Sequence, residues 1–362
     1  MAWLVGLVPT REACSMRSGS SRWAHGLVVG KFSPLHRGHE LVIQHALDHC
    51  ERVTVLGYSQ PEWAGCERER RERWVHRRFP QVCNVQLDDE TVRARCAALF
   101  LPWRPMPPNH ADDVTHQDWL TWLLTHVLRE QPDAMFASEP YVEPTCERLG
   151  REWGRIVSPV RVDVGRHQVP VCATQIRADV HAHRWALAPE VYQDFVLRVA
   201  LVGGESTGKT TLAQALASRT GAVWVPEYGR ERWAQCGGRL TLSDLMEIAH
   251  VQLERERLLT QQTHRFLFCD TSPLTTLGYA RWMFDQQPDA LVGMAAHRYD
   301  LIVLCEADFD FVQDGTRQDA VFRDQQQAWY RDQLRRRGEA VVRVSGPLMQ
   351  RVEQVLACLQ EQ

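Results

Sequence analysis

The sequence lacks the features that mark several specialised protein classes. Its 11 cysteines are odd in number and never spaced as CxxC, which argues against a disulfide framework and a structural zinc site. No apolar run approaches the ~18 residues of a membrane span, and residues 1–26 lack both a basic start and a clear cleavage site. The net charge of -3 provides no positive electrostatic potential of the kind that attracts nucleic acid. We therefore expect a cytoplasmic protein with reduced cysteines and no membrane or DNA partner.

The apolar content suffices for two domains. The chain has 362 residues, of which 44% are hydrophobic and 24% charged. Strand-like apolar runs alternate with helix-like stretches, as expected for parallel sheets built from βα units. We predict an α/β protein with two doubly wound parallel-sheet domains at residues 25–184 and 198–362, a linker at 185–197 and a loose leader at 1–24.

The predicted strands fall into two series, 26–29, 52–56, 82–87 and 134–137, then 199–202, 222–225, 266–269, 301–305 and 340–344. Helices are expected at 91–101 and 115–130. The six arginines between Arg68 and Arg78 interleave with glutamates, so this stretch is interpreted as a solvated helix face.

The first motif, GKFSPLHRGH, covers residues 30–39, after an apolar run and at the start of a helical pattern. His36 and His39 supply hydrogen-bond donors, and Lys31 adds a cation. Gly38 lets backbone approach a phosphate at a helix start, where free N–H groups favour anions. These residues suit a reaction in which another phosphate attacks the α-phosphorus of ATP. Such a reaction needs the reactants to be positioned and their negative charge to be stabilised. The alternative is that both histidines are satisfied polar residues that cap the helix.

This motif resembles the first signature of the nucleotidylyltransferase superfamily. That family's second signature, (S/T)xxIR, appears at residues 172–177 as CATQIR, with Cys172 where the family often has serine. The resemblance implies a Rossmann-like domain in which the later motif starts a helix that binds the ATP triphosphate. Thr174 and Arg177 would then contact phosphate, and the nucleotide-binding candidates of the first motif are Gly30, Phe32 and Gly38.

The second motif, GGESTGKT at residues 203–210, fits GxxxxGK[ST] completely and lies between an apolar strand and an amphipathic helix. Backbone N–H groups of such a loop surround the β-phosphate, Lys209 reaches the β/γ oxygens and Thr210 binds Mg²⁺. The nucleotide-binding candidates are Gly203, Glu205, Ser206, Thr207, Gly208, Lys209, Thr210 and Thr211. The loop alone indicates only nucleotide binding.

Further residues indicate a kinase. Asp270 ends an apolar strand, as a Walker-B-like metal carboxylate must. Residues 313–319 resemble a flexible lid that carries an arginine. When such a lid closes, Arg317 and Arg323 could contact the transferring phosphoryl group. The alternative for these arginines is a set of surface ion pairs with Asp314, Asp319 and Asp324.

Glu227 follows a predicted strand, at the place where many nucleoside kinases keep the carboxylate that accepts the 5′-hydroxyl proton. Tyr228 beside it is a substrate-binding candidate. A helix cap or an ion pair is the alternative role for Glu227.

The chain resembles the NadR-type bifunctional enzymes of bacterial NAD salvage. The resemblance rests on the order of the domains and on three segments, GGESTGKT, VPEYGRE at residues 225–231 and DTSPLTT at 270–276. The resemblance covers residues 25–360. It implies a C-terminal kinase that makes nicotinamide mononucleotide from nicotinamide riboside and ATP. It also implies an N-terminal adenylyltransferase that converts this product and ATP to NAD and pyrophosphate. Enterobacterial relatives also carry a helix-turn-helix repressor domain, and only residues 1–25 precede the first predicted strand here, so no DNA-binding role is expected.

By the same resemblance, Trp119 or Trp122 would stack on the nicotinamide ring; core packing is the alternative for each. Ser138 and Glu139 would contact adenosine, because the segment after residue 137 resembles the family's SSExYG element, with Val142 at the glycine position.

Two other functions stay open at this point. One is a riboside kinase with a vestigial, nucleotide-sensing adenylyltransferase domain, and the other is a non-catalytic regulator that senses ATP or NAD. Catalytic residues in both halves favour the bifunctional enzyme. The sequence is compatible with a homo-oligomer and does not indicate whether nicotinic acid forms are used.

Overall fold

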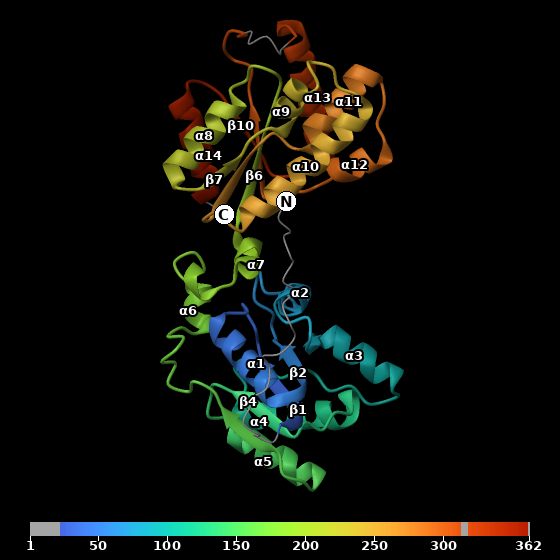
Figure 1. Ribbon diagram of the computed structural model, residues 1–362, viewed down its shortest axis with the longest axis vertical. Helices are drawn as coiled ribbons and strands as arrows, with labels where there is room; N and C mark the ends of the chain where they lie inside the picture. Colours follow the sequence, from blue (N-terminus) through green and yellow to red (C-terminus); the bar gives the residue numbers. More distant parts are fainter. Residues whose placement is uncertain (1–21, 313–317, 361–362) are drawn as a thin grey trace, which may run out of the picture. The chain divides into compact units, whose positions relative to one another are not determined.

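The computed structural model describes residues 22–312 and 318–360 (Figure 1). Packing divides the chain into two compact units. The first contains the described residues up to Lys31, together with Gly38–Glu62 and Phe79–Gln168, and the second contains Phe32–Arg37, Trp63–Arg78 and the described residues from Val169 on. Each unit holds one five-stranded sheet. Within the described ranges, no helix combines the length and the apolar character that crossing a membrane requires.

The first sheet has the order β3-β2-β1-β4-β5, and all its neighbouring strands are parallel. Its strands are β1 (Trp23–Gly30), β2 (Cys50–Tyr58), β3 (Cys83–Leu87), β4 (Ala134–Ala137) and β5 (Ser158–Arg161). The helices between them are α1 (Arg37–His49), α3 (Asp89–Ala98), α4 (Asp113–Trp122) with its π-helical continuation η1 (Leu123–Leu128), and α5 (Val142–Trp153). The four predicted strands are present, and β5 was not predicted.

Both faces of the first sheet are covered. Leu27 and Val28 are consecutive in β1, so their side chains point to opposite faces, and both are buried. Leu27 packs with residues of α3, α4 and α5 in one hydrophobic cluster. Asp88 and Asp112 cap α3 and α4 by accepting hydrogen bonds from Thr91 N and Thr115 N. This two-sided burial explains why these strands are near-continuous apolar runs.

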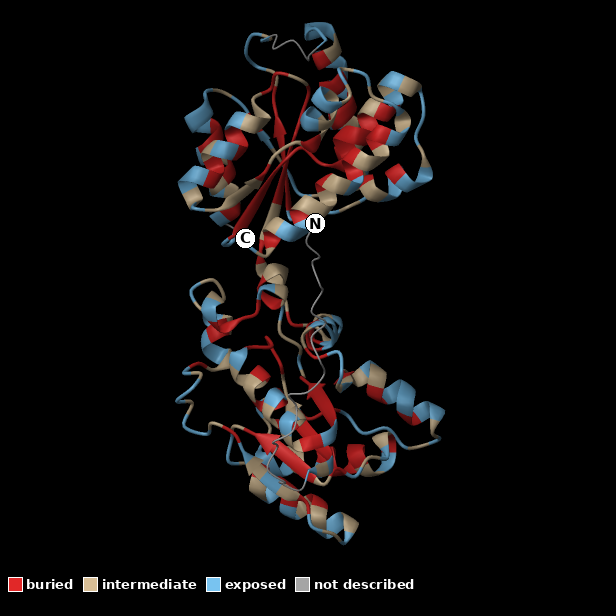
Figure 2. Cartoon of the chain, viewed as in Figure 1, coloured by how far each residue is buried: buried red, intermediate tan, exposed pale blue. Residues whose placement is uncertain are grey.

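The second sheet is also parallel, with the order β10-β9-β6-β8-β7. Its strands are β6 (Leu197–Val202), β7 (Val223–Val225), β8 (Phe266–Asp270), β9 (Leu301–Cys305) and β10 (Val341–Val344). One face is covered by α8 (Lys209–Thr220) and α14 (Leu348–Gln360), and the other by α9 (Tyr228–Gln235), α10 (Leu242–Thr260), α11 (Pro273–Phe284), α12 (Asp289–Ala295) and α13 (Ala320–Arg337) (Figure 1). The predicted fold class is therefore confirmed. The buried strands between exposed outer helix faces are visible in Figure 2.

The arginine-rich stretch is a helix, α2 (Arg68–Arg78), but not simply a solvated one. Arg71 and Trp74 are fully buried, and the Trp74 indole donates to Asp194 Oδ2 at 2.9 Å. The expectation of a solvated helix face was therefore incomplete. Charged residues dominate the composition of α2, so the sequence pattern did not indicate its buried side.

The segment after residue 168 is structured as α6 (Ala173–Ala178), η2 (Arg184–Ala186), α7 (Pro189–Tyr192) and η3 (Gln193–Phe195). The buried Tyr192 accepts a hydrogen bond from Arg265 N at 3.1 Å. Residues 185–197 therefore pack within the second unit. Whether 25–184 and 198–362 fold as independent domains stays a prediction.

Candidate functional site

The loop between β6 and α8 has a backbone that depends on glycine at two places. Gly203 has a φ of 142°, and a Cβ there would lie 2.7 Å from Cys305 O. A Cβ on Gly204 would lie 2.7 Å from Arg323 O. Backbone packs too closely at both positions for a larger residue. The Lys209 ammonium lies over this loop and donates to Gly203 O at 3.1 Å and Gly204 O at 2.9 Å.

A hydroxyl and a carboxylate meet beside this loop. Asp270 is the last residue of β8, the strand next to β6, and its Oδ2 accepts from Thr210 Oγ1 at 2.6 Å. Burial raises the pKa of Asp270, while the Thr210 hydrogen bond and the Lys209 charge act in the opposite direction.

These oxygens fit a magnesium ion. Asp270 Oδ1 is buried without a hydrogen-bond partner among the described residues. Elsewhere in the described chain, no cluster of three or more histidine, cysteine or acidic side chains could hold a metal. Mg²⁺ is usually bound by one or two protein oxygens together with substrate phosphates and water, and Thr210 with Asp270 provides such a pair.

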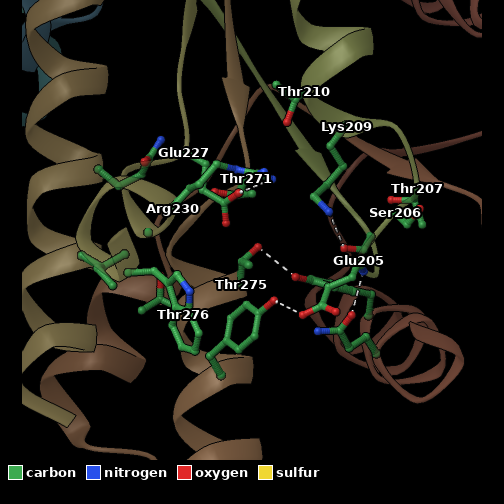
Figure 3. A pocket seen from close by; sticks show the side chains of 18 of the residues that line it. Glu205, Ser206, Thr207, Lys209, Thr210, Glu227, Arg230, Thr271, Thr275 and Thr276 are labelled. Carbon is green, nitrogen blue, oxygen red and sulfur yellow. Dashed lines mark hydrogen bonds and ion pairs between the residues drawn. The ribbon is translucent and has the colours of Figure 1, made fainter. Parts of the chain in front are cut away.

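The loop forms one wall of a cavity of about 240 Å³ (Figure 3). The predicted nucleotide-binding residues Gly203, Glu205, Ser206, Thr207, Gly208, Lys209, Thr210 and Thr211 all line it. The other lining residues include Glu227, Arg230, Trp233, Tyr279 and Tyr330. A phosphate-sized group and a second, partly apolar molecule can therefore be placed next to each other.

Glu227 points into this cavity from the start of α9. Burial and the nearby Asp270 charge raise the pKa of Glu227, whereas Lys209 and Arg230 act against this shift. Its side chain makes no capping hydrogen bond, and Arg230 lies 3.8 Å away as an ion-pair partner. A partly buried carboxylate with a raised pKa has the properties of a general base.

The roles of three other predicted residues stay predictions. Tyr228 is not among the described residues that line the cavity, and its hydroxyl donates to Glu247 at 3.0 Å. Arg323 is buried, donates to Phe309 O at 2.9 Å and lies 3.8 Å from Asp324. Arg317 lies outside the described residues.

The first motif occupies the turn between β1 and α1. Gly30 ends β1, His36 is buried directly before α1, and Gly38 and His39 lie in the first helical turn. Phe32 is buried as well. In the first unit, the Lys31 ammonium donates to Asn109 O at 2.9 Å.

The structure connects the two nucleotidylyltransferase-like signatures within the second unit. Arg177, on α6, donates to Ser33 O at 2.6 Å and to Thr174 Oγ1 at 3.1 Å. Its guanidinium also lies 4.0 Å from the centre of the Trp63 ring. A residue of the second signature is thus bonded to the backbone of the first. Trp63 was missed because no local sequence signal marks it.

The predicted aromatic stack is less well placed. Trp119 and Trp122 are only 5% and 6% exposed and belong to the hydrophobic core of the first unit, so their packing matches the core alternative. Ser138 follows β4 and is half-buried, while Glu139 is exposed and pairs with Arg166 at 3.2 Å. Contacts of these four residues with a substrate stay predictions.

Several cavity residues were not singled out from the sequence. Arg230 belongs to VPEYGRE, and Thr275 and Thr276 belong to DTSPLTT, so two quoted motifs contained a signal for them. Tyr279 follows one helical turn later on α11. Tyr330, which donates to Thr275 Oγ1 at 2.8 Å, comes from α13 and had no local signal.

Comparisons with known proteins agree with this architecture. A family model described as an AAA domain matches residues 198–351. The chain is 28% identical over 313 residues to the trifunctional NAD biosynthesis/regulator protein NadR of Salmonella typhimurium strain LT2, covering 81% of this chain and 71% of that protein. The NadR protein of Escherichia coli strain K12 is 27% identical over the same length and coverage.

Two solved structures are similar over almost the whole chain. A NadR protein in complex with NAD and AMP-PNP superposes with a TM-score of 0.65 at 21% identity and covers 94% of this chain and 98% of that one. A NadR protein in complex with NR gives a TM-score of 0.66 at 19% identity, covering 94% and 97%. At these identities the structural likeness establishes a shared fold.

Proposed function

Because the chain is a homologue of the NadR proteins, we propose that it is a bifunctional enzyme of NAD synthesis. In this proposal the second unit phosphorylates nicotinamide riboside with ATP to nicotinamide mononucleotide. The first motif serves the second reaction, which adenylylates this mononucleotide with another ATP to NAD and pyrophosphate. The names of the relatives and the ligands NAD, AMP-PNP and NR of the solved NadR structures support these substrates.

The kinase half rests on one observation: Lys209, Thr210 and Glu227 line one cavity, and Thr210 Oγ1 donates to Asp270 Oδ2 at 2.6 Å. Lys209 would bind the β- and γ-phosphates. Thr210 and Asp270 would hold Mg²⁺, which neutralises charge on these phosphates. Glu227 would accept the 5′-hydroxyl proton while the 5′-oxygen bonds to the γ-phosphorus and the bond to ADP breaks.

The remaining cavity wall fits a flat, partly apolar ring. Trp233, Leu245 and Ile248 line it together with Tyr279, whose hydroxyl donates to Glu205 Oε1 at 2.8 Å. Aromatic and aliphatic side chains bind a pyridine ring by stacking and by burial of apolar area. A nucleoside whose base is such a ring is therefore a suitable acceptor.

Adenylyl transfer needs a different set of groups. The attacker, a phosphate oxygen of the mononucleotide, is already ionised at neutral pH, so no general base is required. Its bond to the α-phosphorus forms as pyrophosphate leaves, and the protein must stabilise negative charge. We assign this task to Lys31, His36, His39 and Arg177, with Thr174 as a further phosphate ligand. The bond from Arg177 to Ser33 O supports joint action of the two signatures.

Incubation of the full-length chain with nicotinamide riboside, ATP and Mg²⁺, followed by chromatography, tests this proposal. NAD as the product supports both activities. Nicotinamide mononucleotide alone would favour the riboside kinase with a vestigial adenylyltransferase domain, and no product would favour a nucleotide sensor. A parallel reaction that starts from the mononucleotide shows whether the second step works when the first fails.

A further inference from the structure

The phosphate-binding loop of the second unit contains a residue in an unfavourable conformation. Ser206 has a φ of 54°, between Gly203 at 142° and Gly208 at 79°. Residues with a Cβ rarely adopt positive φ, and they keep it only where surrounding contacts hold the backbone. Side chains from two distant helices supply such contacts.

Helix α13 holds the first half of the loop. Gln327 Oε1 accepts from Gly204 N at 3.0 Å, and Gln326 Oε1 accepts from Glu205 N at 2.7 Å. Both glutamines are almost fully buried. The Gln327 amide is itself fixed, because its Nε2 donates to Cys305 O at 3.1 Å and to Glu306 Oε2 at 3.2 Å.

Helix α14 holds the second half. Arg351 is 3% exposed, and its Nη1 donates to Thr207 O at 2.9 Å. The rest of the guanidinium donates to Glu306 O at 3.0 Å and Gly346 O at 2.8 Å and pairs with Asp308. One planar cation thus connects the loop to the ends of β9 and β10.

We propose that Gln326, Gln327 and Arg351, here named the loop brace, are positioning residues that keep the loop in its ATP-binding shape. The proposal rests on the kinase half of the proposed function. The brace contacts the backbone of Gly204, Glu205 and Thr207 on both sides of Ser206, so it fixes the loop conformation. Gln326 also lines the cavity, whereas Gln327 and Arg351 are not among its lining residues, so the test uses the latter two.

This role predicts a specific kinetic pattern. A loop that adopts the competent shape only part of the time binds ATP more weakly by that fraction. Once ATP is bound, the loop makes the same contacts as before, so turnover at saturating ATP changes little. The acceptor side of the cavity, with Glu227 and Tyr279, is not touched by Gln327 or Arg351, so the KM for the riboside stays the same.

The test uses full-length Gln327→Met, Arg351→Met and the double variant in riboside phosphorylation at varied Mg-ATP. We expect the KM for ATP to rise about tenfold in each single variant, with kcat and the riboside KM within about twofold of wild type. Arg351→Lys keeps a cation and donors, and we expect it to recover part of the ATP affinity.

Thr263→Val is a matched control. Thr263 is 1% exposed, and its Oγ1 accepts from Val223 N at 2.9 Å, so this change also removes the side-chain acceptor of a partly buried backbone amide, but at β7 instead of the loop. We expect a loss of thermal stability similar to that of Gln327→Met, with an unchanged KM for ATP.

An unchanged KM for ATP in the folded double variant would overturn the loop-brace proposal. A rise of the KM for ATP in Thr263→Val equal to that in the brace variants would overturn it as well. If Arg351→Met is insoluble, Arg351→Lys and Gln327→Met decide the question by the same criterion. Absence of riboside phosphorylation in wild type would instead contradict the proposed function. Calorimetric titration with Mg-ATP then tests the brace alone, since weaker binding to the double variant supports it and identical isotherms overturn it.

Discussion

Both sheets have a central strand, β1 or β6, that ends in a loop and leads into a helix, α1 or α8. They differ in what the neighbouring strands contribute. Beside β6, β8 ends at Asp270, whose carboxylate lies 2.6 Å from Thr210 Oγ1. Beside β1, the strands β2 and β4 end at Tyr58 and Ala137.

This difference shows that strand order, more than the loop itself, decides what chemistry a phosphate-binding turn can support. A carboxylate at the end of the adjacent strand provides a place for Mg²⁺ in the second unit. The first motif has no carboxylate at the last residues of its neighbouring strands, and its candidate groups are donors and cations. We therefore expect the two sites to respond separately to mutation.

The largest effect is expected at Lys209. Lys209→Ala should lower riboside phosphorylation by about 1000-fold, because the β- and γ-phosphates lose their cation. NAD formation from added nicotinamide mononucleotide should continue, since the proposed ligands of the other reaction are Lys31, His36, His39 and Arg177. Separate assays of the two steps check this. Loss of both activities in soluble protein would mean that the two sites form one catalytic unit.

The reciprocal change is at the first motif. His36→Ala or His39→Ala should lower adenylyl transfer by at least about 100-fold through loss of charge-stabilising donors, with kinase turnover nearly intact. The measurement is NAD formation from mononucleotide and ATP. Equal rates in wild type and mutants would leave the histidines with a helix-capping role only.

Glu227→Gln tests the general base in the second unit. Turnover of the kinase should fall by about 100-fold. Because burial and the Asp270 charge raise the pKa of Glu227, the wild-type rate should decrease as pH falls through that raised pKa and the base becomes protonated. The pH profile of kcat should lose this limb in Glu227→Gln. An unchanged profile would assign the titration to another group.

The smallest expected effect concerns stability. Burial raises the pKa of Glu256 to about 7 from 4.5, although Tyr299 donates to both carboxylate oxygens. As pH rises from 4.5, Glu256 loses its proton first in the unfolded chain, so folded stability decreases until about pH 7 and is then constant. Wild type should lose about 2.5 kcal/mol relative to Glu256→Gln between about pH 5 and pH 8. Urea unfolding of both proteins measures this, and parallel pH curves would contradict it.

Much of the fold could be predicted because parallel strands buried on both faces are apolar runs in the sequence. β5 was missed, since Ser158–Arg161 has a proline and alternately exposed residues in place of such a run. The burial of Arg71 and Trp74 in α2 was missed because charged neighbours outnumber the apolar residues there. Apolar periodicity reports the average environment of a segment, so single buried side chains of a polar helix escape it.

For the site, the sequence by itself located both candidate phosphate-binding turns, because their motifs consist of residues adjacent in the chain. It also placed Asp270 at the end of a strand and Glu227 just after one. Only the tertiary structure decided which of these groups share a cavity, that Tyr228 turns to Glu247, and that Gln326, Gln327 and Arg351 hold the loop. Those contacts join residues more than a hundred positions apart in several cases, and they depend on the strand order and helix packing that bring them together.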